Sequence, residues 1–170
     1  MKSATKNCTE RQRFRQWWLW AIVLIGPLTM LTVFLPQMIT DYATEDGSNT
    51  NYWIIAFVFC LGIGPIAFIY FMELETTIQK DGLYIKFKPF HRKWIILPFE
   101  TITRATAITY QPLKDYGGWG IRYGGKGKAY NVSGNKGVLL TFKDQKNVLI
   151  GSKNHETLFL AINGHIQSSD

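Results

Sequence analysis

Two long apolar runs dominate the first half of the chain, and a two-residue alternation dominates the second half. Residues 17–35 and 52–72 contain no charged side chain. As α-helices rising ~1.5 Å per residue, both runs are long enough to cross a hydrocarbon core of roughly 30 Å. The pattern predicts a transmembrane helix over 17–35, an external loop over 36–51 and a second transmembrane helix over 52–72.

From residue 73 onward the apolar positions recur every second residue, which is typical of β-strands with one buried face. Asp81-Gly82 separates two such runs, so we expect a tight hairpin whose central residues take positive φ. Further turn signals bring the expected number to seven or eight antiparallel strands in a small barrel or sandwich. A C-terminal α-helix ending near Gly164 completes an α+β domain over 73–170. Its apolar stripe is Leu158, Ala161, Ile162 and Ile166.

Charge is distributed unevenly along the chain and indicates a topology. Residues 1–16 carry a net charge of +4, residues 36–51 carry −3 and residues 73–170 carry +6. Cationic segments are retained on the cytoplasmic side of a membrane, so we expect a multi-pass protein with both termini in the cytoplasm. Because an apolar run follows directly, we interpret 1–16 as a basic cytoplasmic tail and not as a nucleic-acid-binding arm.

Small side chains recur on one face of the second apolar run, at Ala56, Cys60 and Gly64. This four-residue spacing lets a second helix approach closely. We therefore predict helix packing through these three residues, either with the first run or with another copy of the chain.

The sequence contains no strong signal for catalysis, a metal or a nucleotide. Gly120, Gly125 and Lys126 approach the spacing of a nucleotide-binding loop, but Gly127 stands where a hydroxyl residue is needed. Turn glycines explain this run better. The three histidines lack the spacing of metal ligands. We expect a non-enzymatic protein with no cofactor and no metal, binding neither nucleotide nor nucleic acid.

A group of basic residues in the predicted loops is the main candidate for a binding site. An anionic lipid headgroup or another anionic ligand is the class of partner such residues attract. The alternative is that these are solvated cations at strand edges, where they discourage edge-to-edge pairing. The candidates are His91, Arg92, Lys93, Arg122, Lys126, Lys128 and Lys136.

The order of elements and four short segments resemble a known family. The segments are WIILPFETI (94–102), YGGWGIRY (116–123), KAYNVSG (128–134) and LIGS (149–152). The first is similar to a segment of bacterial pleckstrin-homology-like (PH-like) domains. The other three resemble small bacterial membrane proteins that join two transmembrane helices to such a domain, and this resemblance covers nearly the whole chain. The resemblance implies a PH-like fold and a bacterial inner membrane, and it supplies no activity.

Together these patterns predict an integral membrane protein that displays a non-catalytic, PH-like interaction domain at the cytoplasmic membrane surface. Membrane lipids, a protein partner or a second copy of the chain are the expected partners. The alternative is a small accessory subunit of a membrane transporter or enzyme complex, assembled through its transmembrane helices.

Overall fold

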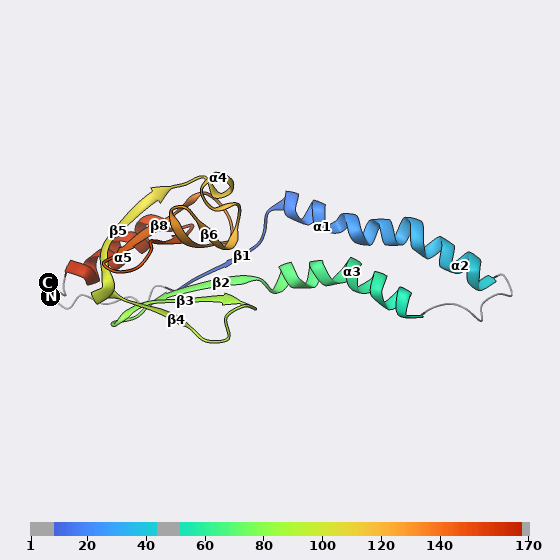
Figure 1. Ribbon diagram of the computed structural model, residues 1–170, viewed down its shortest axis with the longest axis horizontal. Helices are drawn as coiled ribbons and strands as arrows, with labels where there is room; N and C mark the ends of the chain where they lie inside the picture. Colours follow the sequence, from blue (N-terminus) through green and yellow to red (C-terminus); the bar gives the residue numbers. More distant parts are fainter. Residues whose placement is uncertain (1–8, 44–51, 168–170) are drawn as a thin grey trace. The chain divides into compact units, whose positions relative to one another are not determined.

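The computed structural model describes residues 9–43 and 52–167, which form two compact units (Figure 1). The helical unit comprises the described residues between 15 and 71. The β unit comprises residues 9–14 and 72–167. From Thr9 onward the described chain therefore starts in the β unit, leaves it for the helical unit and returns.

The helical unit contains two antiparallel helical arms, one of which is longer than the apolar run that predicted it. The first arm consists of α1 (Trp17–Thr29), a π-helical segment η1 (Met30–Phe34) and α2 (Leu35–Ala43); the second is α3 (Tyr52–Phe71). The expected loop over 36–51 is thus wrong for residues 36–43, which are helical. The π-helical segment ends two residues before Pro36, whose ring would meet the carbonyl of Thr32 in a regular α-helix, and the wider turn relieves that crowding.

Length and apolar composition single out one helix among the described residues. The stretch Trp17–Gln37 is long and apolar enough to cross a membrane, and a shorter apolar segment, Cys60–Phe71, lies in α3. An N-terminal signal sequence shares these features with a membrane span. Because the apolar segment described in α3 is too short to count as a second span, a second transmembrane helix stays a prediction.

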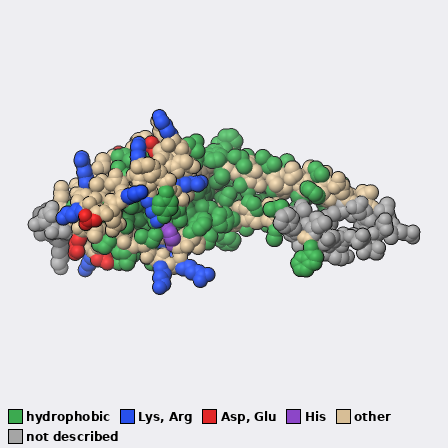
Figure 2. Space-filling view, in the orientation of Figure 1, with side chains coloured by type: hydrophobic (Ala, Val, Ile, Leu, Met, Phe, Trp, Pro, Cys, Tyr) green, Lys and Arg blue, Asp and Glu red, His purple; other side chains and the backbone are tan. Residues whose placement is uncertain are grey.

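The two arms contact each other through glycines. A Cβ placed on Gly26 would lie 3.8 Å from the Cα of Gly62, and one on Gly62 would lie 3.4 Å from the Sδ of Met30. Such a close approach of two helix backbones requires small residues at the crossing. Figure 2 shows that apolar side chains cover much of the visible face of this unit.

The β unit contains two sheets and a C-terminal helix. The first sheet has the order β1-β2-β3-β4 and the second the order β5-β8-β9-β7-β6. A 3₁₀ turn (Phe99–Thr101) and the short helix α4 (Pro112–Tyr116) connect strands, and α5 (His155–Gln167) packs on β5 and β8. The strands are β1 (Thr9–Arg13), β2 (Glu73–Ile78), β3 (Gly82–Lys88), β4 (Ile95–Pro98), β5 (Ile102–Thr109), β6 (Gly120–Gly124), β7 (Gly127–Asn131), β8 (Lys136–Phe142) and β9 (Val148–Gly151).

The first strand corrects part of the prediction of a basic cytoplasmic tail over 1–16, because residues 9–13 are paired in a sheet, whereas residues 1–8 lie outside the described residues and the cytoplasmic location stays a prediction. Thr9–Arg13 pairs antiparallel with β2, so that Arg11 faces Glu75 and Arg13 faces Glu73. Ion pairs join both facing residues, with Arg11 Nε 3.1 Å from Glu75 Oε1 and Arg13 Nη2 3.3 Å from Glu73 Oε2. Gln12 also donates a hydrogen bond of 2.8 Å to the carbonyl of Gly151 in the second sheet. These contacts make β1 an integral edge strand of the β unit.

The apolar alternation predicted from the sequence forms the core. Leu74, Ile85 and Phe87 are fully buried on one face of the first sheet, and Val138 and Leu140 are fully buried in the second. The pairing is not wholly antiparallel as expected, because β7 and β9 run parallel. The connection from β7 to β8 skips one position in the sheet, and β9 then fills that gap beside β7.

Two glycines act differently from the prediction. The hairpin between β2 and β3 is present, but the described residues include no positive φ at Asp81 or Gly82. A Cβ on Gly82 would lie only 2.6 Å from the carbonyl oxygen of Leu97, so this glycine is required for the close approach of β4. Gly164 does not end the last helix, which continues to Gln167. Leu158 and Ile162 of the expected apolar stripe are buried.

Candidate binding surface

The loop between β3 and β4 is held in shape by the first of the predicted basic residues. The backbone N–H of His91 donates to the carbonyl of Phe87 at 2.8 Å, and the N–H of Phe87 donates to Nδ1 of His91 at 3.2 Å. The imidazole also packs edge-on against Tyr130, with ring centroids 5.8 Å apart. His91 therefore braces the loop and links it to β7.

His91 favours its neutral form in this position. Burial lowers its pKa below the ordinary value of 6.5, and the nearby Lys128 ammonium lowers it further. Since Nδ1 accepts a hydrogen bond, the neutral ring carries its proton on Nε2. The sequence grouped His91 with the cations, whereas in the structure it acts as a neutral hydrogen-bonding residue.

We expect the β unit to lose stability as the pH falls below about 6.5. Below that pH the unfolded chain binds a proton at His91, whereas the folded loop, in which the pKa of His91 is lowered, does not yet bind one. The stability contributed by neutral His91 is therefore present above about pH 6.5 and is lost as the pH falls toward the lowered pKa of the folded state. Urea unfolding of the full chain in detergent, from about pH 8 to pH 5, measures the effect. His91→Asn keeps an acceptor but cannot titrate, so its unfolding midpoint should depend less on pH; an unchanged dependence would contradict this role.

Lys128 lies between two aromatic rings at the same place. Its Nζ is 5.0 Å from the ring centroid of Tyr123 and 4.7 Å from that of Tyr130. Burial lowers the pKa of Lys128, but hydrogen bonding to the two phenol groups outweighs burial, so the pKa is raised overall. The ammonium therefore stays charged beside a neutral His91.

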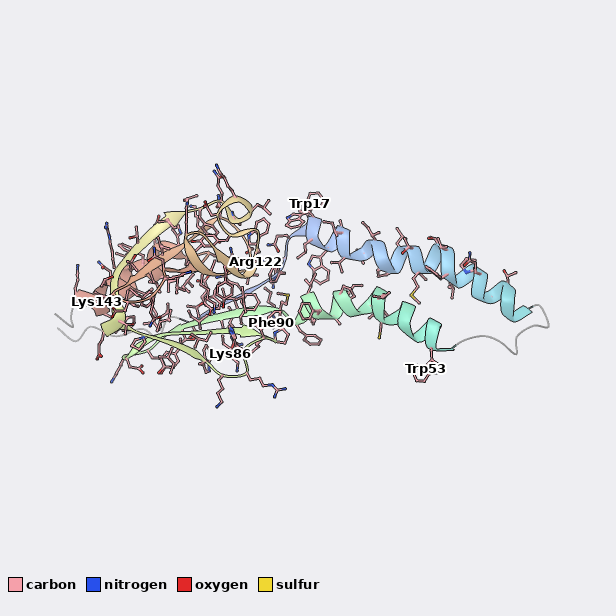
Figure 3. The ribbon with its side chains drawn as sticks, viewed as in Figure 1. Trp17, Trp53, Lys86, Phe90, Arg122 and Lys143 are labelled. Atoms are coloured by element: carbon pink, nitrogen blue, oxygen red, sulfur yellow. The ribbon has the colours of Figure 1, made fainter. Side chains whose placement is uncertain are left out.

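The β3–β4 loop presents further cations and an aromatic ring to solvent. Arg92 and Lys93 are exposed, and among the described residues no carboxylate forms an ion pair with either. The Phe90 side chain is 54% exposed. Figure 3 shows Phe90 at the end of the β unit where β1 ends and β2 begins. In Figure 2, cationic side chains surround a histidine on the visible face of this unit.

The other three predicted basic residues do not join this group. Arg122 lies on the opposite face of β6 from Tyr123, and its Nε donates to the Trp119 carbonyl at 2.9 Å. Lys126 pairs with Asp115 at 2.9 Å. Lys136 begins β8, and its backbone carbonyl accepts a hydrogen bond from the backbone N–H of Ser152. The hydroxyl of Ser152 in turn donates to Glu10, near the start of β1.

Lys126 is a neutralised cation. The backbone N–H of Gln111 lowers the pKa of the Asp115 carboxyl, and the Lys126 ammonium lowers it further, so the pair stays ionised. A cavity of about 280 Å³ opens beside the turn that carries Lys126. It is lined by Gly125, Lys126, Gly127, Lys146 and Asn147. The glycine-rich run thus lies in and around a turn between strands, as the turn interpretation expected.

Two of the three predicted helix-packing residues, Cys60 and Gly64, are not at the crossing of the two helical arms. A Cβ on Gly64 would meet nothing within 4 Å, and Cys60 is exposed. The side chain of Ala56 lies outside the described residues. Within the chain the crossing instead uses Gly62, which sequence reasoning passed over. Packing through Ala56, Cys60 and Gly64 against another chain stays a prediction.

Sequence reasoning also missed the aromatic members of the surface, Phe90 and Tyr123. Tyr123 is 74% exposed. A signal was present in the cations that flank both rings, since aromatic and cationic residues together are typical of surfaces that meet a lipid–water interface. We name Phe90, Arg92, Lys93, Tyr123 and Lys128 the junction surface.

Comparison of the chain with protein-family models, with curated proteins and with solved structures gave no match. The resemblance to PH-like membrane proteins accordingly stays a prediction, and the function is argued below from the geometry.

Proposed function

We propose that the chain is a two-pass membrane protein whose helical unit anchors a non-catalytic β unit at the cytoplasmic membrane surface, where the β unit binds lipid or a protein partner. The observation that carries the proposal is the pairing of β1 with β2. These strands are neighbours in one sheet, although the entire helical unit separates them in sequence.

The pairing constrains how often the chain crosses a membrane. Arg13 and Glu73 are register partners joined by an ion pair, so the chain leaves and rejoins the β unit at one place. A segment that starts and ends on the same side of a membrane crosses it an even number of times. If the apolar helix beginning with α1 crosses, α3 has to return. Its 20 residues and lack of charge suit that role.

Charge supports a cytoplasmic position for the β unit. Residues 1–16 and 73–170 are both net positive, whereas residues 36–51 between the two helical arms carry a net charge of −3. This asymmetry is the one that keeps cationic segments inside. The fold adds an independent argument, because β1 and α5 belong to the same compact unit and therefore share one side.

A binding role, rather than catalysis, fits the composition of the junction surface. Its cations are exposed or lie against aromatic rings, and His91 beside them serves as a structural brace. Unpaired cations next to exposed aromatic rings attract an anionic surface without requiring bond chemistry.

Cysteine labelling of the full chain tests the topology. In a background with Cys8→Ser and Cys60→Ser, single cysteines replace Thr9, Ser48 or Lys143. We expect a membrane-impermeant maleimide to label Ser48→Cys in spheroplasts and to label Thr9→Cys and Lys143→Cys only after the membrane is opened. The chain should also stay with the membrane at alkaline pH and keep its N-terminal peptides.

Two results would overturn the proposal. Labelling of Thr9→Cys and Lys143→Cys from opposite sides would break the even-crossing argument. Removal of residues 17–37 by cleavage would identify a signal sequence in place of a membrane anchor.

A further inference from the structure

The junction surface lies at the end of the β unit where the chain passes to the helical unit. Lys88, the last residue of β3, pairs with Glu73, the first residue of β2, so the β3–β4 loop projects at this end. His91 then brings Tyr130 and Lys128 of β7 to the same loop. Figure 3 places Lys143 at the opposite end of the β unit.

Among the described residues, three cations elsewhere near this end form ion pairs with carboxylates, and those of the junction surface do not. Arg11, Arg13 and Lys88 form ion pairs with the buried carboxylates of Glu73 and Glu75. No described carboxylate pairs with Arg92 or Lys93, and Lys128 is held by aromatic rings. The ion pairs match three cations with two carboxylates, and the junction surface adds three more cations that have no carboxylate partner among the described residues.

The same surface exposes large apolar area. Phe90 is 54% exposed and Tyr123 is 74% exposed, beside the cations named above. Aromatic rings next to Lys and Arg are the composition found at the interfacial layer of membranes, where the ring enters the headgroup region and the cation meets phosphate.

The linkers to the helical arms are short. One residue, Met72, separates α3 from β2, and three residues, 14–16, separate β1 from α1. At no more than ~3.6 Å per residue, they cannot carry this end far beyond the headgroup region, which is roughly 5–8 Å deep on each side of the hydrocarbon core.

We infer that the junction surface is a lipid-docking surface, with Phe90 and Tyr123 entering the headgroup layer of an anionic membrane and Arg92, Lys93 and Lys128 contacting lipid phosphates. The inference rests on the proposed membrane anchoring and adds the partner of the binding surface. Docking fixes the β unit against the membrane instead of leaving it free to turn on its linkers.

Depth measurements on the full chain test this docking. A nitroxide label is attached at Phe90→Cys or, as a control, at Lys143→Cys, in the background without Cys8 and Cys60. The protein is placed in nanodiscs made of phosphatidylcholine with or without phosphatidylglycerol. We expect the Phe90 label to be more accessible to oxygen than to a water-soluble nickel complex when phosphatidylglycerol is present, and the Lys143 label to be accessible to nickel in both.

Charge-reversed variants separate specific docking from general attraction. Arg92→Glu with Lys93→Glu should return the Phe90 label to water. Lys80→Glu with Lys143→Glu makes the same change in net charge at the turn between β2 and β3 and at the opposite end of the β unit, and should leave the label in the lipid. High salt should act like the first pair, since the Debye length falls to about 3 Å at 1 M.

Each outcome decides between named alternatives. A Phe90 label that stays accessible to nickel in anionic nanodiscs would overturn the inference. If a co-purified protein then shields that label from nickel, the surface binds a protein partner and not lipid. If both charge-reversed pairs move the Phe90 label equally, the net charge of the chain explains the attraction to the membrane, and the junction surface is not a specific docking site. If the chain fails to insert into nanodiscs at all, the membrane-anchoring proposal fails instead, so the two failures are distinguishable.

Discussion

Replacement of Gly127 by alanine should destabilise the β unit by about 2–5 kcal/mol. Gly127 has a φ of 114°, which side chains other than glycine rarely adopt, and a Cβ there would lie 2.1 Å from the carbonyl oxygen of Asn147. That oxygen accepts the hydrogen bond of 2.9 Å from Lys128 N–H that begins the pairing of β7 with β9. The substitution would therefore separate the two strands and displace Lys128 from its aromatic neighbours.

The same turn supplies a matched control for this substitution. Gly125 does not have positive φ, and a Cβ there would meet nothing within 4 Å, so Gly125→Ala should be tolerated. Hydrogen exchange of the full chain in detergent measures both variants at the amides of β7 and β9. Equal protection in the two variants would show that the close contact at Gly127 is relaxed at no cost.

Local patterns in the sequence predicted those elements whose cause is local. The two uncharged runs correspond to helical arms, and the Asp81-Gly82 hairpin is present because alternating residues on each side bury one face. The apolar stripe of the last helix is likewise buried at Leu158 and Ile162. In each case neighbours within a few residues along the chain determine the structure.

The first strand could not be predicted in this way. Its sequence, TERQR, has no apolar alternation, and its partner lies some sixty residues away beyond the helical unit. What stabilises it is a complementary charge pattern, with Arg11 and Arg13 spaced two apart opposite Glu75 and Glu73. That pattern is readable only after the two strands have been placed side by side.

The basic cluster was predicted in part, for a related reason. Arg92 and Lys93 are exposed in one loop as the sequence suggested, and tertiary structure adds Lys128 through its contacts with Tyr130. Arg122 is excluded because alternation along β6 sends it to the other face. Lys136 begins β8, which β9 separates from β7 in the sheet order, and no local pattern fixes that order.

Removal of residues 2–14 should abolish cooperative unfolding of the β unit. The deletion unpairs β2 along five register positions and removes the buried Phe14. At about 1 kcal/mol for each lost hydrogen bond and about 2–3 kcal/mol for the aromatic side chain, the loss approaches the total stability of roughly 5–15 kcal/mol for a typical domain. It also leaves the Glu73 carboxylate without its arginine partner and leaves Glu75 with Lys88 alone. Urea unfolding monitored by hydrogen exchange in detergent gives the measurement.

Two comparisons make the effect specific to β1. Deletion of residues 2–8 stops before the strand and should leave the transition in place. A peptide of residues 9–14, added to the longer deletion, should restore protection of β2 amides, because strand pairing needs no covalent link. The same peptide with Arg11→Glu and Arg13→Glu would face Glu75 and Glu73 with like charge and should restore far less. An unaltered transition after the longer deletion would mean that the β unit is complete without β1, and the two ends of the helical unit would then no longer have to lie on the same side of a membrane.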